Sequence, residues 1–232
     1  MRILIVEDEP LIARRVEQFC RKILESRLEL LRRAESFDAA RAELEATPFD
    51  VVLLDLKLHE RDGMELLQLA VAGSFHTIVV SANHDQALRA FEFGVLDFVP
   101  KPFSVERLER ALARVNAPAG RSAHAATRLA VRKHGRVELV AVEDILYVEG
   151  SDKYSELVLT NGRRELHDKN LSRLEAVLPA IFERTHKSYL VRMNAVVRLY
   201  ALEGSRYELE LGNGVRLPVG RTRYSALRAQ IA

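Results

Sequence analysis

The residues best suited to chemistry stand directly after short apolar runs in the first half of the chain. Three acidic side chains, a hydroxyl and a lysine occupy these places: Glu7, Asp8, Asp55, Ser81 and Lys101. Clustered carboxylates repel one another unless a cation lies among them, and oxygen ligands without His or Cys suit Mg²⁺. A lysine and a hydroxyl beside Mg²⁺ would neutralise a phosphoryl group. The alternative, that these are ordinary polar strand ends, fits any one of them better than all five.

The elements that must position these residues are five β–α units. We predict strands at 2–6, 28–32, 51–54, 77–80 and 96–99, separated by helical patterns. Val51 to Leu54 is apolar at every position, as in strands whose two faces are both buried in a parallel sheet. The first half is therefore predicted to be an α/β domain with a doubly wound five-stranded parallel sheet. Ligands of such sheets bind beyond the carboxyl ends of the strands, where the five residues lie.

The second half alternates apolar and polar residues with a period of two. Turn residues at 134–135, 161–162 and 212–214 separate pairs of such runs, which predicts three hairpins. Helical spacing is limited to a short stretch at 171–178 and to the last residues, 224–231. We therefore predict a mostly antiparallel β domain with short helices.

Charge and composition also divide the chain. Residues 117–127 lack an apolar period, so we predict a linker there between a domain at 1–116 and a domain at 128–232. Residues 1–117 carry 16 Lys+Arg and 20 Asp+Glu, whereas residues 118–232 carry 19 and 13. The basic half is the one that could meet a polyanion.

Several classes of protein are excluded or disfavoured by the composition. A single cysteine, Cys20, excludes a disulfide framework or a zinc site made of cysteines, and we expect it to be a buried helical residue. No apolar run approaches the roughly 20 residues of a membrane span, and the N-terminus lacks a signal-peptide pattern. We expect a soluble cytoplasmic protein. No helix–turn–helix, phosphate loop or cyclase motif is visible, so we expect no enzymatic output.

In the basic half, cations and small hydroxyls gather at three places. One group lies near Lys153, where a loop leads into a strand. A second group lies in the non-periodic stretch 186–189, and a third lies at the start of the last helix, near Arg221. Loop cations suit phosphate contacts, and long arginines can reach guanine edges. For any single one of them, an ordinary exposed cation is the simpler interpretation.

Residues 1–115 resemble the receiver domain of two-component response regulators, which has a flavodoxin-like fold. The resemblance lies in the acidic pair Glu7-Asp8, in the stretch from Asp55 to Gly63, in Ser81 and in Lys101-Pro102. His59 departs from the proline that is usual at its position.

This resemblance implies that Asp55 accepts a phosphoryl group from a histidine kinase. It implies that Asp8 and Asp55 bind Mg²⁺ with the main-chain carbonyl of Lys57, and that Glu7 acts through a water. Lys101 and Ser81 would then hold the phosphoryl oxygens, and Phe98 would be a rotating switch residue. Self-catalysed phosphotransfer and dephosphorylation would be the only reactions.

Residues 128–232 resemble the LytTR-type DNA-binding domain of the LytR/AlgR-like regulators. The matching stretches are 145–149, 152–154, 182–191 and 217–221, among which His186-Lys187-Ser188 is the hallmark. The resemblance implies DNA contacts by loops that enter successive major grooves. The residues it assigns to these contacts are Lys153, Ser155, His186, Lys187, Arg221 and, more weakly, Arg223.

The sequence thus predicts a phosphorylation-controlled transcription regulator. Its expected partners are a cognate histidine kinase and double-stranded promoter DNA with repeated half-sites, and we expect a homodimer when it is phosphorylated. Two alternatives remain at this stage. One is a signalling adaptor whose basic domain binds protein or RNA, and the other is a flavoprotein.

Overall fold

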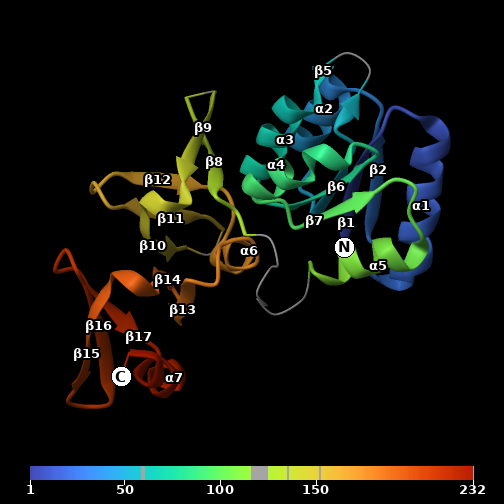
Figure 1. Ribbon diagram of the computed structural model, residues 1–232. Helices are drawn as coiled ribbons and strands as arrows, with labels where there is room; N and C mark the ends of the chain where they lie inside the picture. The colour runs from blue at the N-terminus through green and yellow to red at the C-terminus, as the bar shows by residue number, and fades with distance from the viewer. Residues whose placement is uncertain (59–60, 116–124, 135, 152, 232) are drawn as a thin grey trace.

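The first half of the chain folds around a parallel sheet. The computed structural model describes the whole chain except residues 59–60, 116–124, 135, 152 and 232. The sheet has the strand order β2-β1-β3-β6-β7, and every neighbouring pair is parallel (Figure 1). Its strands are β1 (Arg2–Val6), β2 (Leu30–Ala34), β3 (Val51–Leu54), β6 (His76–Ser81) and β7 (Asp97–Pro100). The predicted doubly wound α/β domain is confirmed.

Helices cover both faces of this sheet. They are α1 (Pro10–Leu24), α2 (Phe37–Ala46), α3 (Gly63–Ala72), α4 (Ala87–Glu92) and α5 (Val105–Ala113). Apolar side chains of α1 and α5 pack on one face, and those of α2, α3 and α4 pack on the other. Ser36 and Ser104 cap α2 and α5, because their hydroxyls accept main-chain N–H bonds at 3.2 and 3.3 Å. Cys20 is a fully buried residue of α1, as expected.

Three local features differ from the sequence prediction. β2 begins two residues later than expected, at Leu30, and only its last residue is fully buried. A 3₁₀ turn, His84–Gln86, precedes α4 where one continuous helix was expected. A small hairpin of β4 (Lys57–Leu58) and β5 (Arg61–Asp62) follows β3. It was not predicted, because two-residue strands carry no periodic signal.

The second half is built from antiparallel sheets. A five-stranded sheet has the order β12-β11-β10-β14-β13, a three-stranded sheet has the order β15-β16-β17, and β8 pairs with β9. The three predicted hairpins are present as β8–β9, β11–β12 and β16–β17. The strands are β8 (Arg128–Lys133), β9 (Arg136–Ala141), β10 (Ile145–Gly150), β11 (Ser155–Leu159), β12 (Arg164–His167), β13 (Phe182–His186), β14 (Tyr189–Arg192), β15 (Val196–Leu202), β16 (Arg206–Leu211) and β17 (Arg216–Val219).

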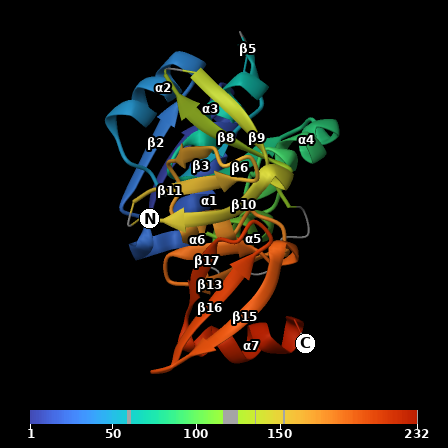
Figure 2. The same ribbon diagram turned by 90° about the vertical axis from the view of Figure 1, so that its left-hand side faces the viewer.

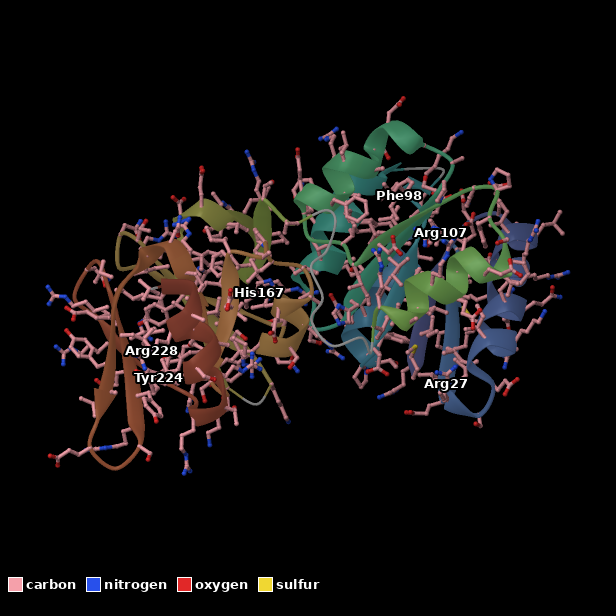
Figure 3. All side chains as sticks on the ribbon, turned by 60° about the horizontal axis from the view of Figure 1, so that its bottom comes forward. Arg27, Phe98, Arg107, His167, Tyr224 and Arg228 are labelled. Atoms are coloured by element: carbon pink, nitrogen blue, oxygen red, sulfur yellow. The ribbon has the colours of Figure 1, made fainter. Side chains whose placement is uncertain are left out.

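Two short helices complete this half, α6 (Leu171–Glu175) and α7 (Arg221–Ile231). Alternating side chains of the five-stranded sheet point to opposite faces and belong to two different apolar clusters. Leu157 and Leu190 pack with α6 and β8, whereas Val158 and Val191 pack with β16 and β17. Tyr224 and Arg228 mark α7 in Figure 3. In the described part of the chain, no helix combines the length and apolar character that crossing a bilayer requires.

Candidate functional site

Three carboxylates meet at the carboxyl ends of β1 and β3. These strands are neighbours in register, with Val6 opposite Leu54, so the residues that follow them lie side by side. One oxygen each of Glu7, Asp8 and Asp55 lies within 4.8 Å of the others. Glu7 and Asp55 are buried. The structure therefore brings together the acidic residues singled out from the sequence, whereas Glu9 is exposed at the rim.

A lysine from a third strand end joins this cluster. Lys101 follows β7, and its Nζ donates to Glu7 Oε2 at 2.7 Å and to Asp55 Oδ2 at 2.6 Å. The Lys101 main-chain N–H donates to the Ser81 carbonyl at 3.0 Å, which fixes the lysine beside the end of β6. Burial raises the pKa of Glu7. Burial alone would lower the pKa of Lys101, but the hydrogen bonds to Asp55 and Glu7 outweigh it and raise this pKa.

The expected hydroxyl and backbone groups surround the acceptor strand end. Ser81 is fully buried at the end of β6, and its Oγ is 3.4 Å from the donating main-chain nitrogen of Asn83. The main-chain N–H of Lys57 donates to Asp55 Oδ1 at 3.0 Å. The side chain of Lys57 is exposed. His59 lies outside the described residues, so its departure from the receiver pattern has no structural description.

Phe98 is buried in β7, and an ion pair that the sequence analysis missed adjoins it. Arg107 of α5 donates to both carboxylate oxygens of Asp97, at 3.0 and 2.8 Å, and also to the main-chain carbonyl of Phe98. Figure 3 shows Arg107 and Phe98 close together on α5 and β7. An aspartate that opens an apolar strand, followed ten residues later by a helical arginine, was the available signal. This pair fixes α5 against β7.

The chemistry of the donor set fits a hard divalent cation. Three carboxylates converge, and no imidazole or thiol is among the described residues of the cluster. Such oxygen ligands match Mg²⁺. The Lys101 ammonium holds two of the carboxylates, and an ammonium can equally hold phosphoryl oxygens. The arrangement can therefore bind a cation and neutralise a phosphoryl group on Asp55.

A second candidate site lies on the basic half, where three segments are hydrogen-bonded together. His186 is the last residue of β13 and Lys187 begins the turn to β14, so the stretch expected to be irregular is a tight hairpin. The Gly150 N–H donates to the Ser188 carbonyl at 2.8 Å. The Gly220 N–H, just before α7, donates to the Thr185 carbonyl at 2.8 Å. The three cation-bearing segments of the sequence analysis therefore form one face.

Most of the predicted contact residues are accessible on this face. Lys153, Lys187, Arg221 and Arg223 are exposed, and His186 is half-buried. Ser155 differs, because it is fully buried at the start of β11 and its hydroxyl has no hydrogen-bond partner among the described residues. A strand residue with an inward-pointing side chain cannot be distinguished from a loop residue by type alone. The Ser155 hydroxyl therefore does not reach the surface that the other five share.

His186 has a defined hydrogen-bonding role. Its Nδ1 accepts the Ser188 main-chain N–H at 3.2 Å. Burial, followed by the charges of Lys187 and Arg184, lowers the pKa of His186. A neutral imidazole whose Nδ1 accepts must carry its proton on Nε2. His186 can therefore offer an N–H donor, which suits an acceptor such as guanine N7 or a phosphate oxygen.

Arg184 organises this hairpin and was missed by the sequence analysis. Its Nε donates to the His186 carbonyl at 2.9 Å, and a terminal nitrogen donates to the Lys187 carbonyl. The guanidinium also lies 3.6 Å from Glu175 of α6. A groove of about 490 Å³ runs between these groups and Arg223. Arg184 lies just before the non-periodic stretch 186–189, and the sequence gave no signal of this role.

Comparison with known proteins matches each half of the chain to a family. Residues 3–113 match the response regulator receiver domain family, and residues 135–232 match the LytTr DNA-binding domain family. A transcriptional regulatory protein LytR of Staphylococcus aureus is 26% identical, over 100% of this chain and 99% of the relative. A sensory transduction protein LytT of Bacillus anthracis is 29% identical, over 96% of this chain and 95% of the relative.

Among solved structures, a LytTr DNA-binding domain from Bacillus cereus is 24% identical. The match covers 46% of the present chain and 97% of the Bacillus cereus domain, with a TM-score of 0.41. The two family matches together account for most of the sequence, and they favour DNA over the protein or RNA partner of the adaptor alternative. The chain is a transcriptional regulator and belongs to the response regulators that join a receiver domain to a LytTr DNA-binding domain.

Proposed function

We propose that Asp55 accepts a phosphoryl group from a histidine kinase and that this phosphorylation controls binding to promoter DNA. The observation that carries the proposal is the Lys101 ammonium, 2.6 Å from Asp55 inside a cluster of three carboxylates, two of which are buried. A buried acceptor carboxylate with a cation already in hydrogen-bond contact is suited to phosphoryl transfer, in which catalysis consists largely of positioning and charge neutralisation.

In the proposed step, an oxygen of Asp55 attacks the phosphorus of a phosphohistidine. The new P–O bond forms as the P–N bond breaks, and the imidazole nitrogen leaves with the bonding electrons and takes up a proton. Lys101 then holds one phosphoryl oxygen, because its Nζ is already directed at Asp55. Ser81 holds another from the neighbouring end of β6, and its movement together with that of Phe98 carries the signal outward.

Glu7, Asp8 and Asp55 would hold Mg²⁺, together with the main-chain carbonyl of Lys57. The fit rests on carboxylate oxygens that lie within 4.8 Å of one another. When bound there, the ion would supply charge neutralisation for the transferred phosphoryl group. Asp8 and Asp55 would be direct ligands, and Glu7 would act through water.

On the DNA-binding half, five residues of the shared face would meet the DNA. They are Lys153, His186, Lys187, Arg221 and Arg223. The face is basic and held together by main-chain hydrogen bonds, as a surface that enters major grooves requires. The proposed organisation is a receiver at 1–116, a linker at 117–127 and a DNA-binding domain at 128–232, which dimerises when phosphorylated and binds repeated half-sites.

The direct test of the acceptor is labelling with radioactive acetyl phosphate in a Mg²⁺ buffer. Asp55→Asn should lose the label while retaining its circular dichroism spectrum and melting temperature. The matched control is Asp85→Asn, an exposed aspartate near the same end of the sheet, which should be labelled like the wild type. Undiminished labelling of Asp55→Asn would place the acceptor elsewhere.

A further inference from the structure

Lys169 is a fully buried lysine whose hydrogen-bond partners lie in the other domain. It sits between β12 and α6 of the DNA-binding half and is 2% exposed. Its Nζ donates to the main-chain carbonyls of Val71 and Gly73, at the end of α3 in the receiver half, at 2.7 Å for Gly73. Lysines are rarely buried without a carboxylate partner. Within the described residues, Lys169 makes no salt bridge, and the negative end of the α3 dipole takes that place.

Other contacts surround this lysine at the same boundary. Arg173 of α6 donates to the Ser74 carbonyl and lies 3.4 Å from Asp50, at the amino end of β3. Ala130 of β8 is buried within the apolar cluster of the receiver, and β8 runs along α3 (Figure 2). Ala176 packs against the other receiver cluster. The two halves therefore share a polar and an apolar interface.

The interface extends to the carboxyl end of α4. The Thr127 N–H donates to the Glu92 carbonyl at 3.1 Å. Gly94 has a φ of +82°, and a Cβ there would lie only 3.4 Å from Ala126. A glycine thus lets the start of the DNA-binding half approach the turn that ends α4. Within the receiver half, the Gly94 N–H donates to the Phe91 carbonyl at 2.8 Å, which stabilises this turn.

The same part of the receiver is connected to the proposed switch residues. α4 follows the segment that leaves Ser81, and Phe98 shares its apolar cluster with Ala90 of α4. Ala130 of the DNA-binding half belongs to that cluster as well. Packed interfaces respond to small shifts by changing between discrete arrangements rather than by deforming continuously. A movement of Ser81, Phe98 and α4 would therefore disturb the interface directly.

We propose that this interface is a docking surface of the receiver for its own DNA-binding domain, latched by Lys169 in the unphosphorylated protein and released when Asp55 is phosphorylated. The proposal rests on the proposed function and adds how the acceptor site controls DNA binding. The docked state leaves Lys187 and Arg221 exposed, so it does not cover the DNA-binding face. It fixes the position of that face, and release lets two copies place their faces on repeated half-sites.

The latch is suited to opening because its central contact is costly. Transfer of a cation from water into a site without a carboxylate is unfavourable, and only hydrogen bonds to two carbonyls offset it. Both those carbonyls and the lysine regain water when the domains separate. When the contacts at α4 are lost, the hydrogen bonds of Lys169 to Val71 and Gly73 are therefore too weak to keep the domains docked.

The test is single-molecule energy transfer between dyes on the two halves. Glu45→Cys and Glu203→Cys provide exposed labelling positions, and Cys20 is buried and does not compete for the dye. Measurement at picomolar concentration keeps the protein monomeric. We expect one docked distribution without phosphodonor and a broader, lower-transfer distribution with acetyl phosphate and Mg²⁺.

Two variants test the latch independently of the phosphodonor. Lys169→Glu places a carboxylate against the two carbonyls, and Arg173→Glu reverses a partly exposed charge that faces Asp50. Both should show the released distribution without acetyl phosphate. Their affinity for a single half-site should stay within about twofold of wild type, because the DNA-binding face is untouched. Their affinity for repeated half-sites should reach that of phosphorylated wild type. Arg14→Glu, an exposed reversal on α1, is the charge-matched control.

The outcomes separate the two proposals. If no label enters the wild type, the proposed function fails and the switch with it. If the wild type is labelled but its transfer distribution does not change, the latch alone fails. A docked distribution in both Lys169→Glu and Arg173→Glu would also overturn the latch.

Discussion

At the scale of residues, the chemistry depends on one cation among buried carboxylates. Lys101 is anchored by its own main-chain bond to Ser81, so its ammonium is delivered to Glu7 and Asp55 by the end of β7. Its pKa is raised by those carboxylates, and it stays charged at neutral pH. Sequence order alone could indicate that these residues share an edge of the sheet. It could not indicate that the lysine bridges two of them.

Lys101→Ala tests this role. Removal of the ammonium takes away the group that would hold a phosphoryl oxygen opposite Mg²⁺, so phosphorylation should no longer be transmitted. The measurement is the ratio of affinities for repeated half-sites with and without acetyl phosphate. We expect a ratio near one for Lys101→Ala and the full wild-type gain for Lys22→Ala, an exposed lysine of α1. A full gain in Lys101→Ala, at equal phosphate content, would refute the role.

At the scale of elements, buried side chains fix how neighbouring segments lie. The Arg107–Asp97 pair is one case, since Asp97 is 3% exposed and its carboxylate accepts two bonds from α5. Arg107→Leu should lower the free energy of unfolding by about 2 kcal/mol, because the buried Asp97 carboxylate keeps only the Phe98 N–H at 2.8 Å and the more distant Arg114 at 3.5 Å. Arg110→Leu, exposed on the same helix, should change it little. Urea unfolding of both variants measures the difference, and equal stabilities would contradict the account.

The β13–β14 hairpin is the second case, because Arg184 donates to the carbonyls of His186 and Lys187, which are proposed to contact DNA. Arg184→Lys keeps the charge and loses the planar fork, so we expect affinity for the specific site to fall about tenfold. The salt dependence should stay as in the wild type, because no phosphate contact is lost. Arg216→Lys, on an exposed strand, serves as the control. A reduced salt slope in Arg184→Lys would instead make Arg184 a phosphate contact.

Local signals explain which elements could be predicted. Ser36, Ser104 and the turn at 161–162 act on their immediate neighbours, so the helices and hairpins next to them were predictable. The register of β2 was harder, because four of its five residues are only partly buried or carry charges. Contacts of long range gave no signal. The buried environment of Ser155 and the partners of Lys169, almost 100 residues away, depend on how the elements pack.

At the scale of the whole molecule, Lys169 makes docking depend on pH. Burial, followed by Arg173, lowers its pKa from the ordinary 10.5 to about 7, whereas Asp168 raises it and Arg132 lowers it. His76 has a pKa of about 3 and does not titrate near neutrality. Between pH 7 and 10.5, Lys169 is protonated when the domains are apart and neutral when they are docked. Docking should therefore strengthen as pH rises through this window and weaken as pH falls towards 7.

The energy-transfer assay checks this dependence in the unphosphorylated protein between pH 7 and pH 9. The docked fraction of the wild type should rise across that range. Lys169→Met, which has no titratable group at this position, should show a flat profile. The same rise in both proteins would assign the pH dependence to another group.

The proposed regulation is that phosphorylation of Asp55 controls DNA binding by the other half of the chain. Its most direct test is titration of promoter DNA with repeated half-sites by wild type and Asp55→Asn, each with and without acetyl phosphate in a Mg²⁺ buffer. We predict that the phosphodonor raises the affinity of the wild type at least tenfold and leaves that of Asp55→Asn unchanged, while both bind a single half-site equally. An equal gain in both proteins, or no gain in a fully phosphorylated wild type, would contradict the account.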